Sequence, residues 1–210
     1  MNLGTQFLIN NQKSEGNFNY EYDWVEKELN PEDSEVRQAG ALWGLSLIYQ
    51  NKPNSSLLPA LYKAFNFFEN NSIESGNKKW IVYPNTSYGK TGTIALLSLA
   101  HIDFLRSAEN IEDTTRKKLE SNLDKYINFI VSLRKNTGQF YPYYYHDIGV
   151  GFGDSSPYFD GESLLALTKA AKYLDKEDLK NLIIDSADEV YNKNVVEALD
   201  ENPDSTITKG

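Results

Sequence analysis

The stretch Gln12-Lys13-Ser14-Glu15-Gly16-Asn17-Phe18-Asn19-Tyr20 returns about 120 residues later as Arg134-Lys135-Asn136-Thr137-Gly138-Gln139-Phe140-Tyr141-Pro142-Tyr143. Both copies follow an apolar helical segment, Phe7-Leu8-Ile9 and Phe129-Ile130-Val131. Both precede a glycine that opens a leucine-rich helix, Gly40-Ala41-Leu42-Trp43-Gly44-Leu45 and Gly161-Glu162-Ser163-Leu164-Leu165-Ala166-Leu167. A partial third copy lies between them, Trp80-Ile81-Val82-Tyr83 and then Gly92-Thr93-Ile94-Ala95-Leu96-Leu97. The repeated unit is therefore a helix, a Gly-aromatic turn, a polar loop and a second helix.

The composition narrows the classes of function. The 210 residues carry 21 Lys and Arg against 30 Asp and Glu, a net charge of −9, which argues against a nucleic-acid partner. No apolar run is long enough to cross a membrane. The first residues lack the basic and apolar regions of a signal peptide, so we expect a cytoplasmic protein. Cysteine is absent, which excludes disulfides and thiolate metal ligands.

Apolar spacing of three and four residues predicts an all-α chain whose domain covers residues 1–192, followed by a polar tail over 193–210. The expected helices are 3–12, 35–50, 56–71, 91–107, 111–135, 160–174 and 176–192. Three of them, 35–50, 91–107 and 160–174, are apolar nearly all round, so we expect them to be more buried than the amphipathic ones. No segment shows a sustained alternation of apolar and polar residues with a period of two, so we expect no sheet larger than a short hairpin.

At the Gly-aromatic turns and at the start of the Gly161 helix, the chain resembles the α/α-toroid proteins. This superfamily includes six-hairpin glycosidases, uronate lyases, sugar epimerases, terpenoid cyclases and lanthionine synthetase-like proteins. The resemblance covers residues 1 to about 192 as a pattern of helical hairpins. It implies an α/α-hairpin toroid, or part of one with about three and a half hairpins, because a ring of six would need roughly twice this length.

Departures from the superfamily's motifs favour its carbohydrate-active branch. The chain has no Asp-x-Asp-Asp acid of the cyclase type, and zinc-dependent toroids need Cys and His ligands, whereas this chain has no Cys and 2 His. The sequence Gly149-Val150-Gly151-Phe152-Gly153 follows no predicted strand, so it does not predict a dinucleotide site. We therefore expect no metal and no cofactor. The implied activity is that of a glycoside hydrolase, lyase or sugar epimerase acting on a glycan or small molecule.

A toroid places the first turns of its inner helices, and the loops before them, around a central cavity. The catalytic candidates on this basis are Glu162, Asp160, Asp23 and His146. The candidates for substrate binding are Arg37, Glu21, Tyr22, Trp43, Tyr143, Asp147 and Asp154, with Tyr and Trp as platforms for sugar rings. Sugar hydrolysis needs two carboxyl groups, and Asp160 and Glu162 diverge on a helix, so a pair such as Asp23 with Glu162 is sterically better.

Structural roles compete with each of these assignments. An acid at a helix start, such as Asp160 or Glu162, caps the helix and meets its dipole. Arg37 could pair with Glu35, and the tyrosines after Gly138 could pack locally. His101 lies in an apolar helix, where packing is the expected role.

At the level of the whole chain, the alternative function is a non-catalytic helical-repeat module that binds a protein, peptide or glycan. Three and a half hairpins leave one end of the row uncovered, so we also expect self-association or a missing C-terminal half.

Overall fold

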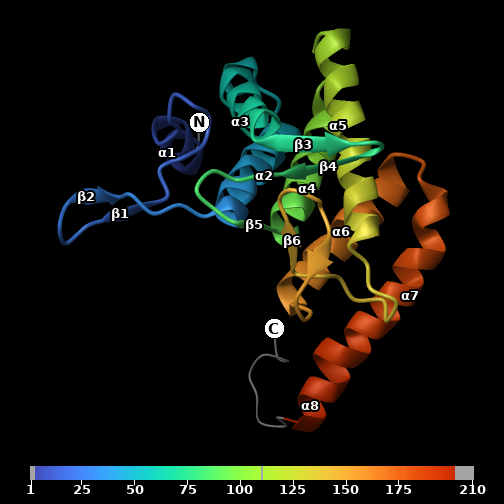
Figure 1. The fold of residues 1–210 in the computed structure, drawn as a ribbon. Coiled ribbons are helices and arrows are strands. Elements are labelled where there is room, and N and C mark those ends of the chain that lie inside the picture. The colour runs from blue at the N-terminus through green and yellow to red at the C-terminus, as the bar shows by residue number, and fades with distance from the viewer. Residues whose placement is uncertain (1–2, 110, 202–210) are drawn as a thin grey trace.

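The computed structural model describes residues 3–109 and 111–201, and their backbone is mainly helical (Figure 1). The long helices are α1 (Leu3–Asn10), α2 (Glu35–Asn51), α3 (Leu58–Asn70), α4 (Thr91–Ser107), α5 (Asp113–Ser132), α6 (Pro157–Tyr173) and α7 (Lys180–Tyr191). Short helical turns lie at Ser55–Leu57 and Glu177–Leu179, and a π-helical turn, Asn192–Glu197, leads into α8 (Ala198–Glu201). The expectation of a helical protein is confirmed. The polar tail instead continues as helix to residue 201, and residues 202–210 lie outside the described part.

The helix α4 lies at the centre of the molecule. It packs against α2 on one side and α6 on the other, while α3, α5 and α7 follow these three helices as their hairpin partners. Every residue of α4 from Thr91 to Leu105 is buried, whereas α2 and α6 expose side chains such as Leu47 and Leu165. The expectation that the three inner helices are more buried than the outer ones is therefore met in full by α4. It also holds for α2, where Arg37, Leu47 and Asn51 are the exposed residues, whereas α6 is no more buried than α3. Within the described residues, only α4 has an inner helix on both sides.

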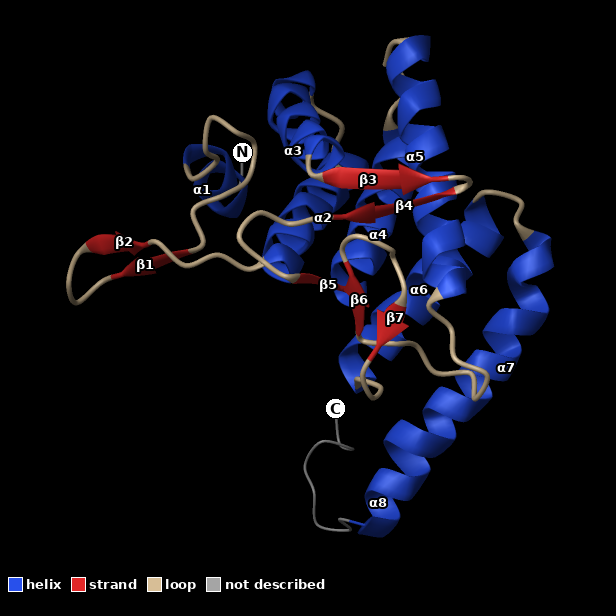
Figure 2. Ribbon diagram, viewed as in Figure 1, coloured by secondary structure: helices blue, strands red, loops and turns tan. Residues whose placement is uncertain are grey.

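Short strands occupy the loops between the hairpins (Figure 2). Two hairpins pair β1 (Glu21–Asp23) with β2 (Glu28–Asn30), and β3 (Ser72–Ser75) with β4 (Lys78–Ile81). A three-stranded sheet joins β5 (Tyr88–Lys90), β6 (Tyr143–Tyr145) and β7 (Gly151–Phe152). This sheet corrects the expectation that nothing larger than a hairpin forms. Its strands have two or three residues each and come from two separate loops, so no local alternation of apolar and polar residues predicts them.

The two Gly-aromatic turns have the same geometry. A β-bridge closes each turn, Gln12 to Phe18 and Arg134 to Phe140. Gly16 and Gly138 have φ angles of 114° and 110°. Residues with a side chain rarely adopt such angles, which explains the glycine in both copies. The repeat read from the sequence is thus also a repeat of backbone conformation.

An inner helix holds each of these turns in place. The N–H of Phe18 donates to the Gln38 side chain on α2 (2.7 Å), and the N–H of Phe140 donates to Asp160 on α6 (2.8 Å). Gln38 and Asp160 occupy the same position in their helices, four residues after Ser34 and Ser156, the residues that precede α2 and α6. A buried backbone N–H without an acceptor is costly, so these side chains tie turn and helix into one unit.

The core between the layers is aromatic. His101 on α4 packs edge-on against Phe65 and Tyr126, and one of its ring nitrogens bonds the carbonyl of Leu97 at 2.8 Å. Burial lowers the pKa of His101 to about 4, so the ring is neutral at pH 7. This confirms packing as its role. None of the helices in the described part is both long and apolar enough to cross a membrane.

Candidate functional site

The first turns of α2, α4 and α6 lie on the side of the molecule where β5 and β6 run (Figure 2). The strand β5 leads directly into α4, and the Thr91 N–H donates to the carbonyl of Pro142 just before β6 (3.0 Å). The hydroxyl of Thr91 donates to the carbonyl of Tyr141 at 2.5 Å. These bonds fix the three-stranded sheet on the N-terminal end of α4, and the two form one candidate site.

Aromatic side chains cluster on this sheet. The Tyr88 ring meets Tyr143 edge-on, with centroids 5.1 Å apart, and meets Phe152 at 5.8 Å. Tyr145 stacks on Phe152 with centroids 4.4 Å apart and an interplanar angle of 22°. Tyr88 and Tyr145 remain exposed, so the cluster presents ring faces and hydroxyl groups to solvent. Of these four residues, only Tyr143 is predicted from the sequence as a platform for a sugar ring.

Glu162 lies against the first turn of α4. A Cβ atom at Gly92 would overlap its Oε2 and would come within 2.5 Å of the Phe159 ring, so the missing side chain at Gly92 makes room for both. The Oε2 atom is buried and makes no hydrogen bond to any described residue. Burial raises the pKa of Glu162 to about 7. Its carboxyl group is therefore about half ionised at neutral pH and can both take and give a proton.

His146 lies in the turn between β6 and β7. Its backbone carbonyl accepts from the Trp80 indole at 2.8 Å, and its ring centroid lies 6.3 Å from that of Tyr144. The Nε2 atom is buried and has no hydrogen-bond partner among the described residues. Burial lowers the pKa of His146, so its ring is neutral at pH 7 and keeps a free nitrogen. His146 thus lies in a turn beside the sheet that carries Tyr88 and Tyr143.

A second buried carboxyl group with a raised pKa belongs to Glu35, the first residue of α2. It is 2% exposed, and neither of its oxygens makes a hydrogen bond of ordinary geometry. Burial raises its pKa to about 7, although hydrogen-bond contacts from the Thr93 hydroxyl and the Lys90 backbone N–H, together with the Lys90 charge, lower the pKa partly. From the sequence alone, Glu35 is only a possible partner of Arg37. The sequence feature that could have indicated a buried acid here is the position of Glu35 at the start of a helix that is apolar nearly all round.

Asp160 is fully buried, and its partners are structural. Besides the Phe140 N–H, it accepts from Asn194 at 3.1 Å and from Gln139 at 3.4 Å. Burial raises the pKa of Asp160, and these donors oppose the shift. Of the two acids near the start of α6, Asp160 holds the turn and Glu162 is left without a partner.

The structure does not bring Glu21, Tyr22 and Asp23 to this site. They form β1, whose hairpin with β2 projects away from the helices (Figure 1). The Asp23 carboxylate accepts from the backbone N–H groups of Val25 and Glu26 at 2.8 and 3.1 Å, which closes the hairpin turn. The suggested pairing of Asp23 with Glu162 does not occur, because the hairpin carries Asp23 away from the helices. Apolar periodicity does not predict such a hairpin, since its turn depends on local contacts of the Asp23 side chain.

Arg37 and Trp43, both on α2, have partners of their own. The Arg37 guanidinium lies over the Tyr20 ring, 5.1 Å from its centroid, and donates to the Tyr20 hydroxyl at 2.8 Å. The Trp43 indole donates to the buried Asp103 at 2.8 Å. Asp103 also receives Lys169 at 2.5 Å and therefore links α2, α4 and α6. Arg37 does not pair with Glu35.

The loop acids Asp147 and Asp154 are exposed. Asp147 lies close enough to His146 to favour its charged form, against the effect of burial. Asp154 follows β7, whose Phe152 belongs to the aromatic cluster. Both acids border the sheet, and their role in binding stays a prediction.

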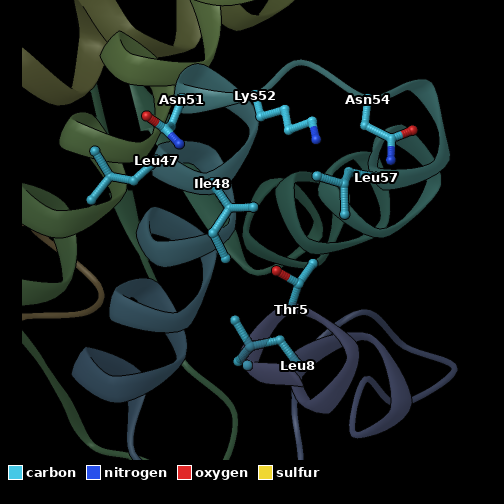
Figure 3. Close-up of a pocket in the computed structure, with 9 residues that line it drawn as sticks. Thr5, Leu8, Leu47, Ile48, Asn51, Lys52, Asn54 and Leu57 are labelled. Carbon is cyan, nitrogen blue, oxygen red and sulfur yellow. The ribbon is translucent and has the colours of Figure 1, made fainter. Parts of the chain in front are cut away.

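A cavity of about 610 Å³ lies elsewhere, between α1, the C-terminal end of α2 and the start of α3 (Figure 3). Leu8, Leu47, Ile48 and Leu57 give it mainly apolar walls, and Lys52 is its charged residue. It is at the opposite end of α2 from Glu35. None of the acids and histidines discussed above lines it.

No protein-family model matches the chain, and no curated protein is found as a relative. Solved structures do match. Cellobiose 2-epimerase from Spirochaeta thermophila matches with TM-score 0.69 and 13% identity over 89% of this chain and 50% of its own. The enzyme from Bacillus thermoamylovorans matches with TM-score 0.69 and 15% identity over 90% and 53%. A D-mannose isomerase matches with TM-score 0.65 and 11% identity over 90% and 49%.

These neighbours are α/α-toroid enzymes, so the expected fold is supported at that level. At such identities the likeness is one of fold alone. The chain spans about half the length of the solved structures that it matches.

Proposed function

We propose that this chain is a carbohydrate-active unit of the α/α-toroid type that catalyses proton transfer on a sugar, as an epimerase or isomerase does. The observation that carries the proposal is Glu162, a half-buried carboxyl group without a hydrogen-bond partner for Oε2 and with a pKa of about 7. Both reactions begin when a base removes the proton at C2, beside the carbonyl group. Isomerisation delivers a proton to C1, whereas epimerisation delivers it to the opposite face of C2, which needs a second proton donor or a rotation of the bound enediol. A carboxyl group that is half ionised at the working pH suits both steps.

The three-stranded sheet fixed on the N-terminal end of α4, the helix that Glu162 contacts at Gly92, carries further groups that such a site needs. The Tyr88, Tyr143 and Phe152 cluster offers ring faces on which a sugar can stack. The neutral His146 offers a nitrogen with no partner in the described chain, which can bind a sugar hydroxyl or carbonyl oxygen according to its tautomer. The names of the structural neighbours, cellobiose 2-epimerase and mannose isomerase, agree with this choice of chemistry over hydrolysis.

Hydrogen exchange tests the proposal directly. The chain is incubated in deuterated water with cellobiose, D-mannose or D-glucose, and deuterium at C2 is followed by NMR. Wild type is expected to incorporate deuterium and to form the epimer or the ketose. The Glu162→Gln variant is expected to lose this activity by at least about 100-fold, because an amide cannot accept the proton.

The matched control is Glu177→Gln, an exposed acid in the short turn that precedes α7. Full exchange activity in Glu162→Gln would remove Glu162 from the reaction. If wild type shows no exchange and instead releases reducing ends or an unsaturated uronate, the activity is hydrolysis or elimination, and the epimerase proposal is wrong.

A further inference from the structure

The apolar cavity of about 610 Å³ beside the C-terminal end of α2 takes no part in the reaction proposed at Glu162. An apolar cavity of about 150 Å³ accepts a molecule as large as benzene. The cavity beside α2 therefore has room for a hydrocarbon chain of several carbons together with a polar head group. The polar residues Lys52 and Asn54 lie on one side, Ile48 and Leu57 in the middle, and Thr5 and Leu8 on the other side (Figure 3).

Lys52 gives this cavity a positive charge that no acid on its walls balances. Among the lining residues that the structure describes, Lys52 is the only charged one. Lys79 and Lys169 pair with Glu69 and Asp103, whereas Lys52 has no such partner in the described part of the chain. In a chain with a net charge of −9, a cavity with one cation and no acid among its described lining residues is a local exception. Its charge favours an anionic ligand.

The end of α2 explains where the donors of the cavity lie. Pro53 ends the helix, and the N–H of Lys52 donates to the carbonyl of Ile48 at 3.1 Å. The Asn54 side-chain oxygen accepts from the N–H of Ser56 at 3.0 Å, which leaves the Asn54 amide nitrogen as a donor on the side of Lys52. Lys52 and Asn54 are exposed, so the cavity opens to solvent on this side.

The helix ends do not change the sign of the charge at this opening. The helix α2 ends here and α3 begins here, and the partial charges of the two helix ends are about half a unit each and opposite in sign. They largely offset one another, so the ammonium group of Lys52 determines the local potential. The cavity thus joins an apolar interior to a cationic opening.

We propose that this cavity binds an aliphatic carboxylate of medium length, about the size of octanoate. The carboxylate group contacts the Lys52 ammonium and the Asn54 amide, and the hydrocarbon chain lies between Leu8, Ile48 and Leu57. Burial of the chain supplies most of the affinity, because each methylene group removed from water strengthens binding by about two- to fourfold. The exposed ammonium group adds a smaller factor that selects the charge of the head group.

Isothermal titration calorimetry at pH 7.5 tests the ligand with four probes: butanoate, octanoate, octan-1-ol and octylamine. Octanoate is expected to bind wild type at one site, and its affinity should exceed that of butanoate by about two- to fourfold for each added methylene group. Octylamine, which carries a positive charge, should bind at least about fivefold more weakly than octanoate.

Two variants separate the head group from the chain. Lys52→Met keeps the aliphatic stem but removes the charge, so it should weaken octanoate by about two- to fivefold and leave octan-1-ol binding unweakened. Ile48→Thr puts a hydroxyl group into the apolar wall and should weaken both ligands, with thermal unfolding as the check that the variant is folded. The matched control is Lys117→Met on the exposed face of α5, which should leave the binding of both ligands unchanged.

The carboxylate site is separable from the reaction proposed at Glu162. Glu162→Gln should bind octanoate as wild type does, whether or not it loses hydrogen exchange at C2 of a sugar. Octanoate affinity that does not change in Lys52→Met, or octylamine binding as tight as octanoate binding, would overturn the carboxylate assignment. An absence of octanoate binding, binding at several sites without dependence on chain length, or binding that a folded Ile48→Thr variant retains in full would overturn the assignment of the cavity.

Discussion

At the scale of single residues, the molecule sorts its acids by the donors around them. Asp33 and Asp160 each accept several hydrogen bonds, and both hold a loop against an inner helix. Glu35 and Glu162 flank the same turn of α4 and have pKa values raised to about 7 by burial. Only the Thr93 hydroxyl and Lys90 oppose this rise at Glu35, and no donor opposes it at Glu162 among the described residues. Groups with that environment concentrate at functional sites, because burial without a partner is a cost that stability alone does not favour.

Glu35→Gln is expected to change how stability depends on pH. Folded protein holds the Glu35 proton up to about pH 7, whereas the unfolded chain releases it near pH 4.5. The folded state binds more protons between these values, so stability falls as pH rises through this window, by up to about 3 kcal/mol. Glutamine removes that loss. Urea unfolding at pH 4.5 and pH 8 should show the variant gaining on wild type only at pH 8, and parallel changes in both proteins would contradict this.

Asp160 offers a test that separates anchoring from catalysis. Asp160→Ala leaves the buried Phe140 N–H without an acceptor and is expected to lower the free energy of unfolding by about 2 kcal/mol. Asp160→Asn keeps an acceptor oxygen and should cost less than half as much in chemical denaturation. An anchor also predicts that the Asn variant retains sugar activity. Loss of activity in a stable Asp160→Asn protein would return Asp160 to the catalytic candidates.

At the scale of elements, the sequence predicted what the repeat determines. The helix expected at 91–107 has those bounds, and the two Gly-aromatic turns share one conformation because Gly16 and Gly138 both have positive φ. The sheet of β5, β6 and β7 was not predicted, because its pairing joins loops about 50 residues apart and its strands are too short for a periodic signal. The same limit applies to the candidate site residues, because contacts between distant loops leave no periodic pattern in the sequence.

Glu162 and Tyr143 could be predicted as site residues, because one lies at the start of a repeated inner helix and the other in the loop before it. The repeat determines which helix starts lie together. Glu35 and Tyr88 could not, because their importance depends on which donors and rings surround them in space. The sequence prediction for the exposed hairpin of β1 and β2 is wrong for the converse reason. Its Asp23 has the right residue type, but a local turn carries it away from the helices.

The contact between α4 and α6 can be tested through its glycine. Gly92→Ala puts a methyl group into the space of the Glu162 carboxyl and the Phe159 ring. We expect a loss of about 1–3 kcal/mol of stability and a marked fall in activity. Gly44→Ala in α2 is the matched control, since a Cβ there meets nothing within 4 Å and alanine should stabilise the helix by about 0.5–1 kcal/mol. Thermal unfolding compares the stability of both variants with that of wild type. Equal effects would mean that the α4–α6 contact is loose.

At the scale of the whole molecule, the row of hairpins has apolar side chains exposed at both ends. On α1 these are Leu3 and Phe7, 88% and 64% exposed, and on α7 they are Ile184 and Tyr191, 57% and 59% exposed. Repeat arrays normally cover their terminal units, because exposed apolar surface favours association. A net charge of −9 opposes that association between identical copies.

The balance of these two effects gives the prediction at this scale: the chain self-associates, and salt strengthens the association. Salt screens the repulsion between acidic copies but leaves the apolar contact intact, so sedimentation velocity should show larger species in about 0.5 M salt than in about 0.05 M. Phe7→Ser combined with Ile184→Ser should reduce the effect, whereas Lys117→Ser, on the exposed face of α5, should not. A monomer at every salt concentration would mean that these side chains do not form an interface between copies. Association that salt weakens would indicate charge pairing instead, and would point to the acidic β1–β2 hairpin and exposed lysines as the contact.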